Sequence, residues 1–208
     1  MRFWICGNAT VRPLIIGQNV IGEPAPRKSR DRLFFAVHPD PPVAQRIVAL
    51  AELLRTKHDL RGKPLPADRV HITLHHLGDH CGLPGALIET ASAAAAKIAM
   101  PPFEVTLDGV ASFPGRDRRP CILRSGAADA NQALHALQSD LGERLREAGL
   151  GRYIERRFTP HVTLLYDERG IIPEIVPPIT WAVRRFALVH SLLGRGEHRV
   201  LAGWDLET

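Results

Sequence analysis

Short apolar segments, separated by turn-forming residues, run through the chain from residue 32 to its end. They are rich in Val, Ile, Leu and Phe, and clusters of Gly or Pro bound several of them, which is the pattern of β-strands. We predict strands at residues 32–37, 69–78, 103–113, 120–125, 158–167, 174–183, 184–193 and 197–206. The glycines of Gly194-Arg195-Gly196 predict a turn between the last two.

Three segments between these strands are predicted to be helices. Asp40 can cap the first, and the prolines that follow it are tolerated in the first turn of a helix. Residues 84–99 form the second, and Asp129 and Gly149 can begin and end the third. The apolar stripes at helical spacing are Val43, Ile47, Leu50 and Leu54 in the first helix, and Leu134, Leu137, Leu141 and Leu145 in the third.

One strand pattern occurs twice, as HITLHHLG at residues 71–78 and as HVTLLYD at residues 161–167. Each copy closes the order strand, helix, histidine strand, with similar lengths of chain between the first strand and the histidine. This predicts an internal duplication and not a short-period solenoid. We expect two similar lobes, related by an approximate two-fold axis, that bring the two histidine strands to face each other across a central cleft. Helices mixed with mainly antiparallel strands favour the α+β class.

The head of the chain differs from the body. Residues 1–30 show no sustained period, and GEPAPRKSRD at residues 22–31 is linker-like, so we expect a loosely held extension at 1–30 followed by one domain at 31–208. Of the 27 basic and 22 acidic residues behind the net charge of +5, six basic and two acidic residues lie in 1–32. The remaining 176 residues therefore carry 21 basic and 20 acidic groups. The body has no large net field to steer RNA.

The cysteine pattern and the lengths of the apolar runs indicate the cellular compartment and the class of protein. The cysteines, Cys6, Cys81 and Cys121, are odd in number and widely spaced, so they do not predict a disulfide framework, and a reducing cytoplasm is expected. No apolar run approaches the roughly 20 residues that span a bilayer. We expect a cytoplasmic protein without membrane attachment, monomeric and without an obligate protein partner.

The two histidine strands suggest acid/base chemistry. Because side chains in a strand alternate between its faces, His71 shares a face with Thr73, and His161 shares one with Thr163. Two imidazoles with pKa values near 6.5 can divide the proton transfers at neutral pH, one as base and one as acid. Hydroxyl groups can donate hydrogen bonds to phosphoryl oxygens as charge develops there. Two imidazoles and two hydroxyl groups together suit acid/base catalysis on a phosphodiester.

These residues make the sequence resemble the 2H phosphoesterases, a family named for two His-x-Ser/Thr-x motifs. It is most similar to the bacterial RNA 2′,3′-cyclic phosphodiesterase branch, also called 2′-5′ RNA ligase-like proteins. The matching pieces are RLFFAV, HITLHHLG, FTPHVTLLYD and LVHSLLGRGEHRVLAGWDL, which together cover about residues 31–208. One motif alone carries little information, whereas two with this spacing and these flanking pieces in order are specific.

The resemblance implies a bilobal α+β fold that hydrolyses the 2′,3′-cyclic phosphate of RNA ends or nucleotides to a 2′-phosphate, without a metal or other cofactor. By resemblance, His71 is the proton donor to the leaving 3′ oxygen and His161 the base that activates water. Thr73 and Thr163 would hold the phosphate. An aromatic residue of the first strand, Phe35 in preference to Phe34, would lie near the base or sugar.

Two positions depart from that family. Five residues after its first motif histidine the branch commonly has Phe, where this chain has His76. Five residues after the second it often has Arg, where this chain has Tyr166. Strict alternation would turn both away from the cleft, but the end of a strand can bulge and re-aim a side chain. We therefore expect Tyr166 to contact the nucleoside of the substrate.

Other interpretations of these residues remain open. The histidines and the cysteine between His71 and Cys81 could form a zinc site and make the protein a metal-dependent hydrolase. Alternation separates His76 from His71 and His75, so we favour His75 and His76 as partly exposed polar residues. The protein could also be an RNA- or nucleotide-binding module of the same fold without turnover. The reverse reaction, joining of 2′-5′ RNA ends, is implied by the family name.

Overall fold

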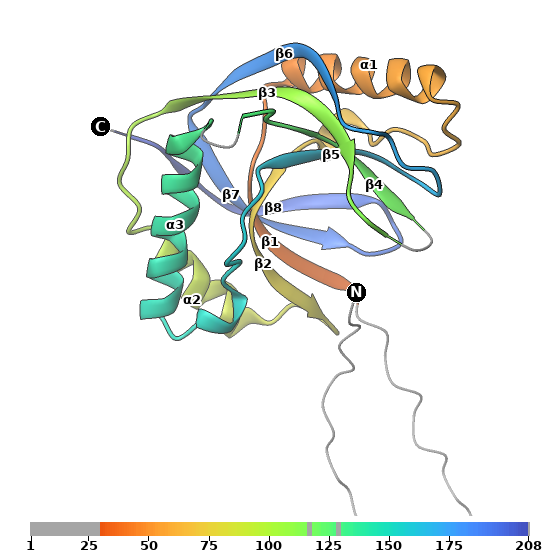
Figure 1. The fold of residues 1–208 in the computed structure, drawn as a ribbon. Helices are drawn as coiled ribbons and strands as arrows, with labels where there is room; N and C mark the ends of the chain where they lie inside the picture. Colours follow the sequence, from red (N-terminus) through yellow and green to blue (C-terminus); the bar gives the residue numbers. More distant parts are fainter. Residues whose placement is uncertain (1–29, 116–117, 128–129, 208) are drawn as a thin grey trace, which may run out of the picture.

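The structure is a computed structural model that describes residues 30–115, 118–127 and 130–207 (Figure 1). In this part of the chain the strands form one antiparallel sheet, and helices cover parts of it. The α+β class is confirmed. The elements are β1 (Asp31–Val37), α1 (Pro41–Lys57), η1 (Ala67–Arg69), β2 (Ile72–His80), α2 (Gly85–Ala95), β3 (Phe103–Ser112), β4 (Arg119–Arg124), α3 (Gln132–Glu147), η2 (Gly151–Tyr153), β5 (His161–Asp167), β6 (Glu174–Val183), β7 (Arg185–Leu192) and β8 (Glu197–Asp205).

The strand order is symmetric about the middle of the sheet. It runs β6-β3-β4-β5-β2-β1-β7-β8, so that the two histidine strands, β5 and β2, are the central neighbours. They pair only through Ile72 and Val162, whereas the other neighbouring strands pair over at least four residues. Two four-stranded halves, one on each side of this seam, are the two predicted lobes. The histidine strands lie edge to edge at the seam.

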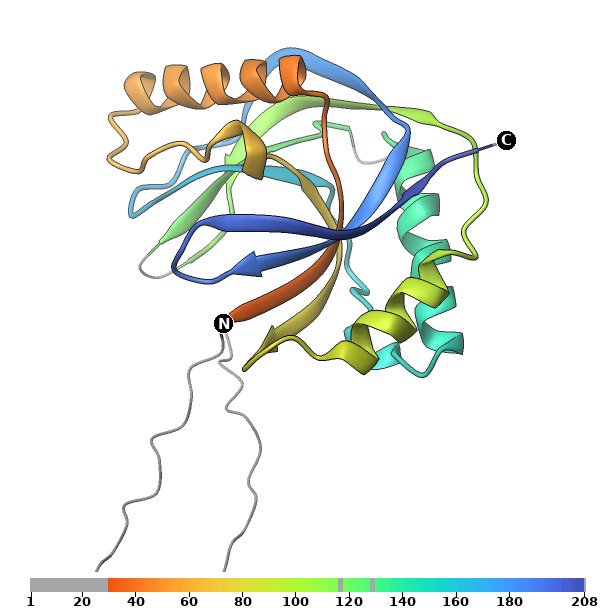
Figure 2. The same ribbon diagram turned by 180° about the vertical axis from the view of Figure 1, so that it is seen from behind.

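The duplication extends to the connections between strands. The order β1-α1-η1-β2 in one half matches β4-α3-η2-β5 in the other. After β1, however, α1 contacts β5 and β6 of the opposite half, and α3 contacts α2, β2 and β3. Figures 1 and 2 show α1 apart from the α2–α3 pair, at a different place along the sheet. The helices therefore tie the two halves together although their strands barely pair.

The helix ends follow the predictions only in part. Asp40 is the N-cap residue of α1, but its side chain makes no capping hydrogen bond. Asp129 lies outside the described residues, and Asn131, in the left-handed conformation, precedes α3. Gly149, with φ of 79°, ends α3, and the N–H of Leu150 bonds back to the carbonyl of Leu145, which is a Schellman arrangement. α2 is shorter than predicted.

Matching bulges interrupt the two histidine strands. Thr73 pairs with Ala36 and His75 with Phe35, so the bulge leaves Leu74 without a partner in the register. In the same way β5 skips Leu164 between its pairs with β4. Each bulge places two successive residues on the buried side, and the residue five after the histidine then returns to the face of that histidine.

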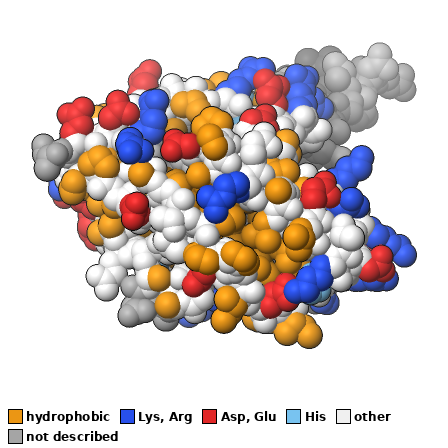
Figure 3. Space-filling view, turned by 90° about the horizontal axis from the view of Figure 1, so that it is seen from above, with side chains coloured by type: hydrophobic (Ala, Val, Ile, Leu, Met, Phe, Trp, Pro, Cys, Tyr) orange, Lys and Arg blue, Asp and Glu red, His pale blue; other side chains and the backbone are white. Residues whose placement is uncertain are grey.

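A large apolar core lies against the sheet and beneath the three helices. A second, smaller cluster fills the opposite face of the half-sheet that contains β1 and β7. The outer surface above α1 and β6 mixes apolar and charged side chains (Figure 3). Among the described residues, no helix is long and apolar enough to cross a membrane.

A carboxylate fixes the loop after α1 to the end of β5. Asp167 is buried and accepts hydrogen bonds from the backbone N–H groups of Arg61 and Gly62, both at 2.6 Å, and from that of Arg169 at 2.8 Å. These hydrogen bonds favour the ionised form and lower the pKa of Asp167, although burial opposes them. A side chain on Gly62 would overlap the backbone oxygen of Tyr166. The loop therefore braces the strand end that carries Tyr166.

We predict that Gly62→Ala destabilises the protein, by about 1–3 kcal/mol, because the new methyl group overlaps backbone that cannot move away alone. Gly85→Ala is the matched control: the space around Gly85 is open and helix α2 begins there. Thermal unfolding of both variants measures the difference. Equal melting temperatures for Gly62→Ala and Gly85→Ala would show that the loop is not packed against β5.

Candidate active site

The seam of the sheet brings the four motif residues together. Ile72 and Val162 are paired and fully buried in the core. Their neighbours in sequence turn to the other face and are partly exposed: His71, immediately before β2, Thr73 on β2, and His161 and Thr163 on β5. In an antiparallel pair the residues that flank a paired position lie across from each other. The two histidines and the two threonines therefore surround one point.

Both histidines are held in the same way. Nδ1 of His71 lies 2.7 Å from the carbonyl oxygen of Arg69, and Nδ1 of His161 lies 2.7 Å from that of Thr159. A carbonyl oxygen only accepts, so each Nδ1 carries the proton and donates it. In the neutral rings Nε2 is then the basic nitrogen. The duplicated backbone thus presents two imidazoles with the same orienting contact and the same reactive nitrogen.

Three aromatic rings surround His71. Phe34 stacks on it with ring centres 4.8 Å apart, His198 meets it edge-on at 5.3 Å, and His38 lies at 5.9 Å. Burial disfavours the charged imidazole and, with smaller contributions from the neighbouring histidines, lowers the pKa of His71 to about 3. In the protein without substrate His71 is therefore neutral at pH 7.

His161 has a simpler environment. Phe113 meets its ring edge-on at 4.9 Å, and burial lowers the pKa of His161. The two halves are alike in backbone, but among the described residues His38 and His198 lie against the ring of His71 and not against that of His161. His38 follows β1 and His198 belongs to β8, so this cluster draws on three separate parts of the chain.

The structure corrects the choice of aromatic residue on β1. Phe35 is fully buried in the main core, where its ring contacts Phe186 and Trp204. Phe34 lies on the opposite face of the strand and stacks on His71. The central strand β1 is buried on both faces, so its apolar pattern carries no sign of which face looks toward the site.

Tyr166 and His76 occupy matching places beside the motif residues. The bulges at Leu164 and Leu74 bring both onto the face of the histidines, and both are exposed, Tyr166 by 38%. The guanidinium of Arg118 lies 5.5 Å from the centre of the Tyr166 ring. An aromatic ring with an adjacent cation is a surface on which a base can stack.

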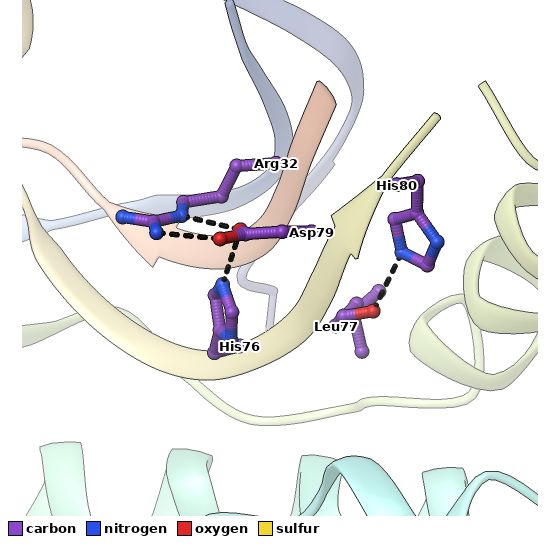
Figure 4. A network of polar contacts seen from close by, with 5 residues as sticks. All are labelled: Arg32, His76, Leu77, Asp79 and His80. Atoms are coloured by element: carbon purple, nitrogen blue, oxygen red, sulfur yellow. Dashed lines mark hydrogen bonds and ion pairs between the residues drawn. The ribbon is translucent and has the colours of Figure 1, made fainter. Parts of the chain in front are cut away.

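Beside His76 lies a charged network (Figure 4). Arg32 donates two hydrogen bonds to Asp79, at 2.7 and 2.8 Å, and Nε2 of His76 lies 3.3 Å from the same carboxylate. The hydrogen bond from Arg32 lowers the pKa of Asp79, and the hydrogen bond to Asp79 raises that of Arg32. Burial lowers the pKa of His76. The network fixes Arg32 and His76 at the edge of the site.

His75 is a correction: it is fully buried, where a partly exposed position was expected. Its Nε2 donates to the carbonyl of Gln138 at 2.8 Å, and its Nδ1 accepts from the backbone N–H of Glu155 at 3.1 Å. Gln138 also donates to the carbonyl of Glu155. This buried network links β2 and α3 to the segment that leads to His161, so its role is structural.

The described histidines between residues 71 and 81 do not form a zinc site. His75 points toward α3. His76 points toward Asp79, and Nε2 of His80 lies 2.9 Å from the carbonyl oxygen of Leu77 (Figure 4). The described residues contain no group of three His, Cys, Asp or Glu side chains placed to hold a metal ion. The metal-site interpretation has no geometric support.

Sequence reasoning missed several residues near the motif histidines. His38 and His198 have no motif of their own, and Phe113 sits beyond the end of a strand. Arg69 precedes the first motif by two residues, and its carbonyl orients His71. The repeat is the only signal in the sequence that points to such residues, because residues at equal distances in sequence from the two histidines take equivalent places in the two halves.

Comparisons with known proteins agree with this geometry. The family model described as the 2′-5′ RNA ligase superfamily matches residues 30–195. An RNA 2′,3′-cyclic phosphodiesterase of Escherichia coli (strain K12) is 29% identical over an alignment of 181 residues, which covers 84% of this chain and 96% of that protein.

Solved structures extend the likeness to the fold. The apo form of LigT from E. coli is similar with a TM-score of 0.67 and 28% identity, covering 87% of this chain and all of that one. The protein TT0787 of Thermus thermophilus has a TM-score of 0.61 and 28% identity, covering 84% of this chain and 97% of that one. E. coli LigT in complex with 3′-AMP has a TM-score of 0.63 and 26% identity, covering 87% of this chain and all of that one.

We predict that His71 stays a neutral Nδ1–H imidazole from pH 8 down to about pH 4 in the protein without ligand. The unfolded chain takes up this proton near pH 6.5 and the folded protein only near pH 3. This histidine therefore lowers the free energy of unfolding as the pH falls through that window. Imidazole ¹⁵N shifts assigned by comparison with His71→Ala measure the titration. A midpoint near pH 6.5 for His71 would contradict the assigned environment.

Proposed function

The chain belongs to the 2′-5′ RNA ligase superfamily, and from that membership and the paired histidines we propose that it hydrolyses 2′,3′-cyclic phosphates of RNA ends or nucleotides. The proposed product is the 2′-phosphate with a free 3′ hydroxyl. The observation that carries the proposal is the seam, where two identically oriented imidazoles and two threonines share one face. The name of the E. coli relative supports the same substrate.

The proposed reaction needs two proton transfers. Nε2 of His161 takes a proton from water while the water oxygen bonds to phosphorus. The bond from phosphorus to the 3′ oxygen breaks, and His71 gives that oxygen a proton. The hydroxyls of Thr73 and Thr163 donate hydrogen bonds to the non-bridging oxygens, where they stabilise the charge of the transition state. Hydrolysis regenerates the starting protonation state when the two histidines exchange a proton with solvent.

The environment of His71 sets a condition on this mechanism. Burial lowers its pKa to about 3, so the free protein does not hold the proton that His71 must donate. A bound phosphodiester brings a negative charge next to the ring of His71. A nearby negative charge favours the protonated imidazolium and so raises its pKa. His71 would therefore gain its proton together with the substrate. His71 would then carry the proton that it must donate only while the phosphodiester is bound.

We predict that the protein converts adenosine 2′,3′-cyclic phosphate to adenosine 2′-phosphate in excess EDTA. His71→Ala and His161→Ala should each lower kcat by roughly 10²–10⁴-fold, the scale of a lost general acid or base. The double variant should be far less impaired than the product of the two losses, because the residues act as one unit. Product identification by chromatography and steady-state kinetics measure these effects.

His58→Ala is the control for this experiment, since His58 pairs with Glu174 at the end of α1 and not with the motif residues. Binding of cyclic nucleotide without turnover would identify a binding module of the same fold. Loss of turnover in EDTA with recovery on added zinc would replace the mechanism by a metal-dependent one. Either result would overturn the proposed function.

A further prediction concerns Tyr166, which we propose stacks on the nucleoside. Tyr166→Ala should raise KM more than it lowers kcat, by an amount equivalent to one stacking contact, roughly 1–3 kcal/mol. Tyr166→Phe should be mild, because the ring remains. Kinetics on adenosine 2′,3′-cyclic phosphate and melting temperatures of both variants test it. A lower melting temperature with unchanged kcat/KM would show that Tyr166 only packs at the edge of the sheet.

A further inference from the structure

Two residues in contact with His71 each carry a polar side-chain atom that lacks a hydrogen-bond partner in the described part of the chain. The atoms are Nε of Arg69 and Nδ1 of His198, and both are shielded from solvent. Arg69 also forms no ion pair with a carboxylate among the described residues. Buried polar groups in folded proteins are almost always hydrogen-bonded, so two neighbouring exceptions point to a ligand that completes them.

Arg69 and His198 come from different elements that pack together. Arg69 ends the short helix η1, and η1 contacts β8, the strand of His198. The guanidinium of Arg69 lies near Gly196, in the turn before β8: a Cβ atom on Gly196 would be 3.4 Å from Nη1 of Arg69, which is van der Waals contact. The pKa of His198 is lowered to about 4, first by burial and then by the positive charge of the nearby Arg69 guanidinium. The two groups are therefore neighbours, with the charge on Arg69.

The same two residues adjoin the catalytic centre. The carbonyl of Arg69 accepts the hydrogen bond from His71, and the His198 ring lies edge-on to both His71, at 5.3 Å, and Phe34, at 5.5 Å. In the other half, the residue that orients His161 is the uncharged Thr159. At this position of the repeat, two residues before the motif histidine, a positive charge is therefore present only on the His71 side.

The chemistry of this pair fits a phosphate. A guanidinium and a neutral imidazole both offer N–H donors, and Arg is well suited to phosphate because of its planar array of donors. Asp68 is the acidic group closest in influence to His198, but its side chain is exposed on the outside of η1. An RNA end that carries a cyclic phosphate has its next phosphate one nucleotide away.

We propose that Arg69 and His198 form a second anion subsite, which binds the phosphate on the 5′ side of the nucleotide whose cyclic phosphate lies between His71 and His161. The inference rests on the proposed function, because that function places the first phosphate. It makes a 5′-phosphorylated end a better ligand than a bare nucleoside cyclic phosphate. The subsite reads the sugar–phosphate chain and not the base.

Product binding tests the subsite without turnover. Calorimetry should give a dissociation constant roughly 10- to 100-fold lower for adenosine 2′,5′-bisphosphate than for adenosine 2′-phosphate, the scale of charged hydrogen bonds to one phosphate. In Arg69→Gln and in His198→Phe the ratio of these two dissociation constants should fall toward one. Arg69→Lys keeps the charge and should retain part of the preference for adenosine 2′,5′-bisphosphate, which separates loss of the subsite from misfolding.

Arg199→Gln is the matched control, because Arg199 is the exposed neighbour of His198 on β8 and pairs with Glu197. Its preference should equal that of the wild type. Equal affinity of the wild type for the two ligands would overturn the subsite, while turnover of adenosine 2′,3′-cyclic phosphate would still support the proposed function. Equal weakening of both ligands by Arg69→Gln would also overturn it, since Arg69 would then act at the first phosphate.

Discussion

The pairing of Ile72 with Val162 is the constraint on which the site depends. This one backbone pair joins the two halves of the sheet, and both side chains are fully buried. With these aliphatic side chains in the core, alternation leaves no choice for their neighbours, which must turn to the other face. Shifting either strand by one residue would bury the histidine of that strand and expose its aliphatic side chains. Core packing therefore fixes the strand register that places His71 and His161 on the same face of the sheet.

Symmetry of the backbone and asymmetry of the side chains have separate consequences. The repeated strands supply equal hydrogen bonds to the two Nδ1 atoms, which explains how two imidazoles become fixed as the same tautomer. The rings around them differ, because β1 and β8 bring Phe34, His38 and His198 to His71 alone. A substrate with unequal ends needs such a difference, and Arg69, whose Nε lacks a partner among the described residues, adds charge on the same side.

Much of this arrangement could be predicted from the sequence, and the failures have definite causes. The repeat, the strands and the faces of His71 and His161 follow from local spacing. His75 was placed wrongly because the bulge at Leu74 breaks alternation, and a bulge depends on pairing with β1. Phe35 was preferred to Phe34 because both faces of β1 are apolar. His198 reaches His71 only through contacts between distant segments, which no local pattern records.

We propose that the seam forms a phosphate site between the two histidines. A crystal structure of the protein with adenosine 2′-phosphate bound tests it most directly. We expect a phosphate within hydrogen-bond distance, about 2.7–3.2 Å, of Nε2 of both His71 and His161, with the hydroxyls of Thr73 and Thr163 donating hydrogen bonds to its oxygens. A phosphate that contacts only one of the histidines, or that binds elsewhere on the molecule, would contradict it.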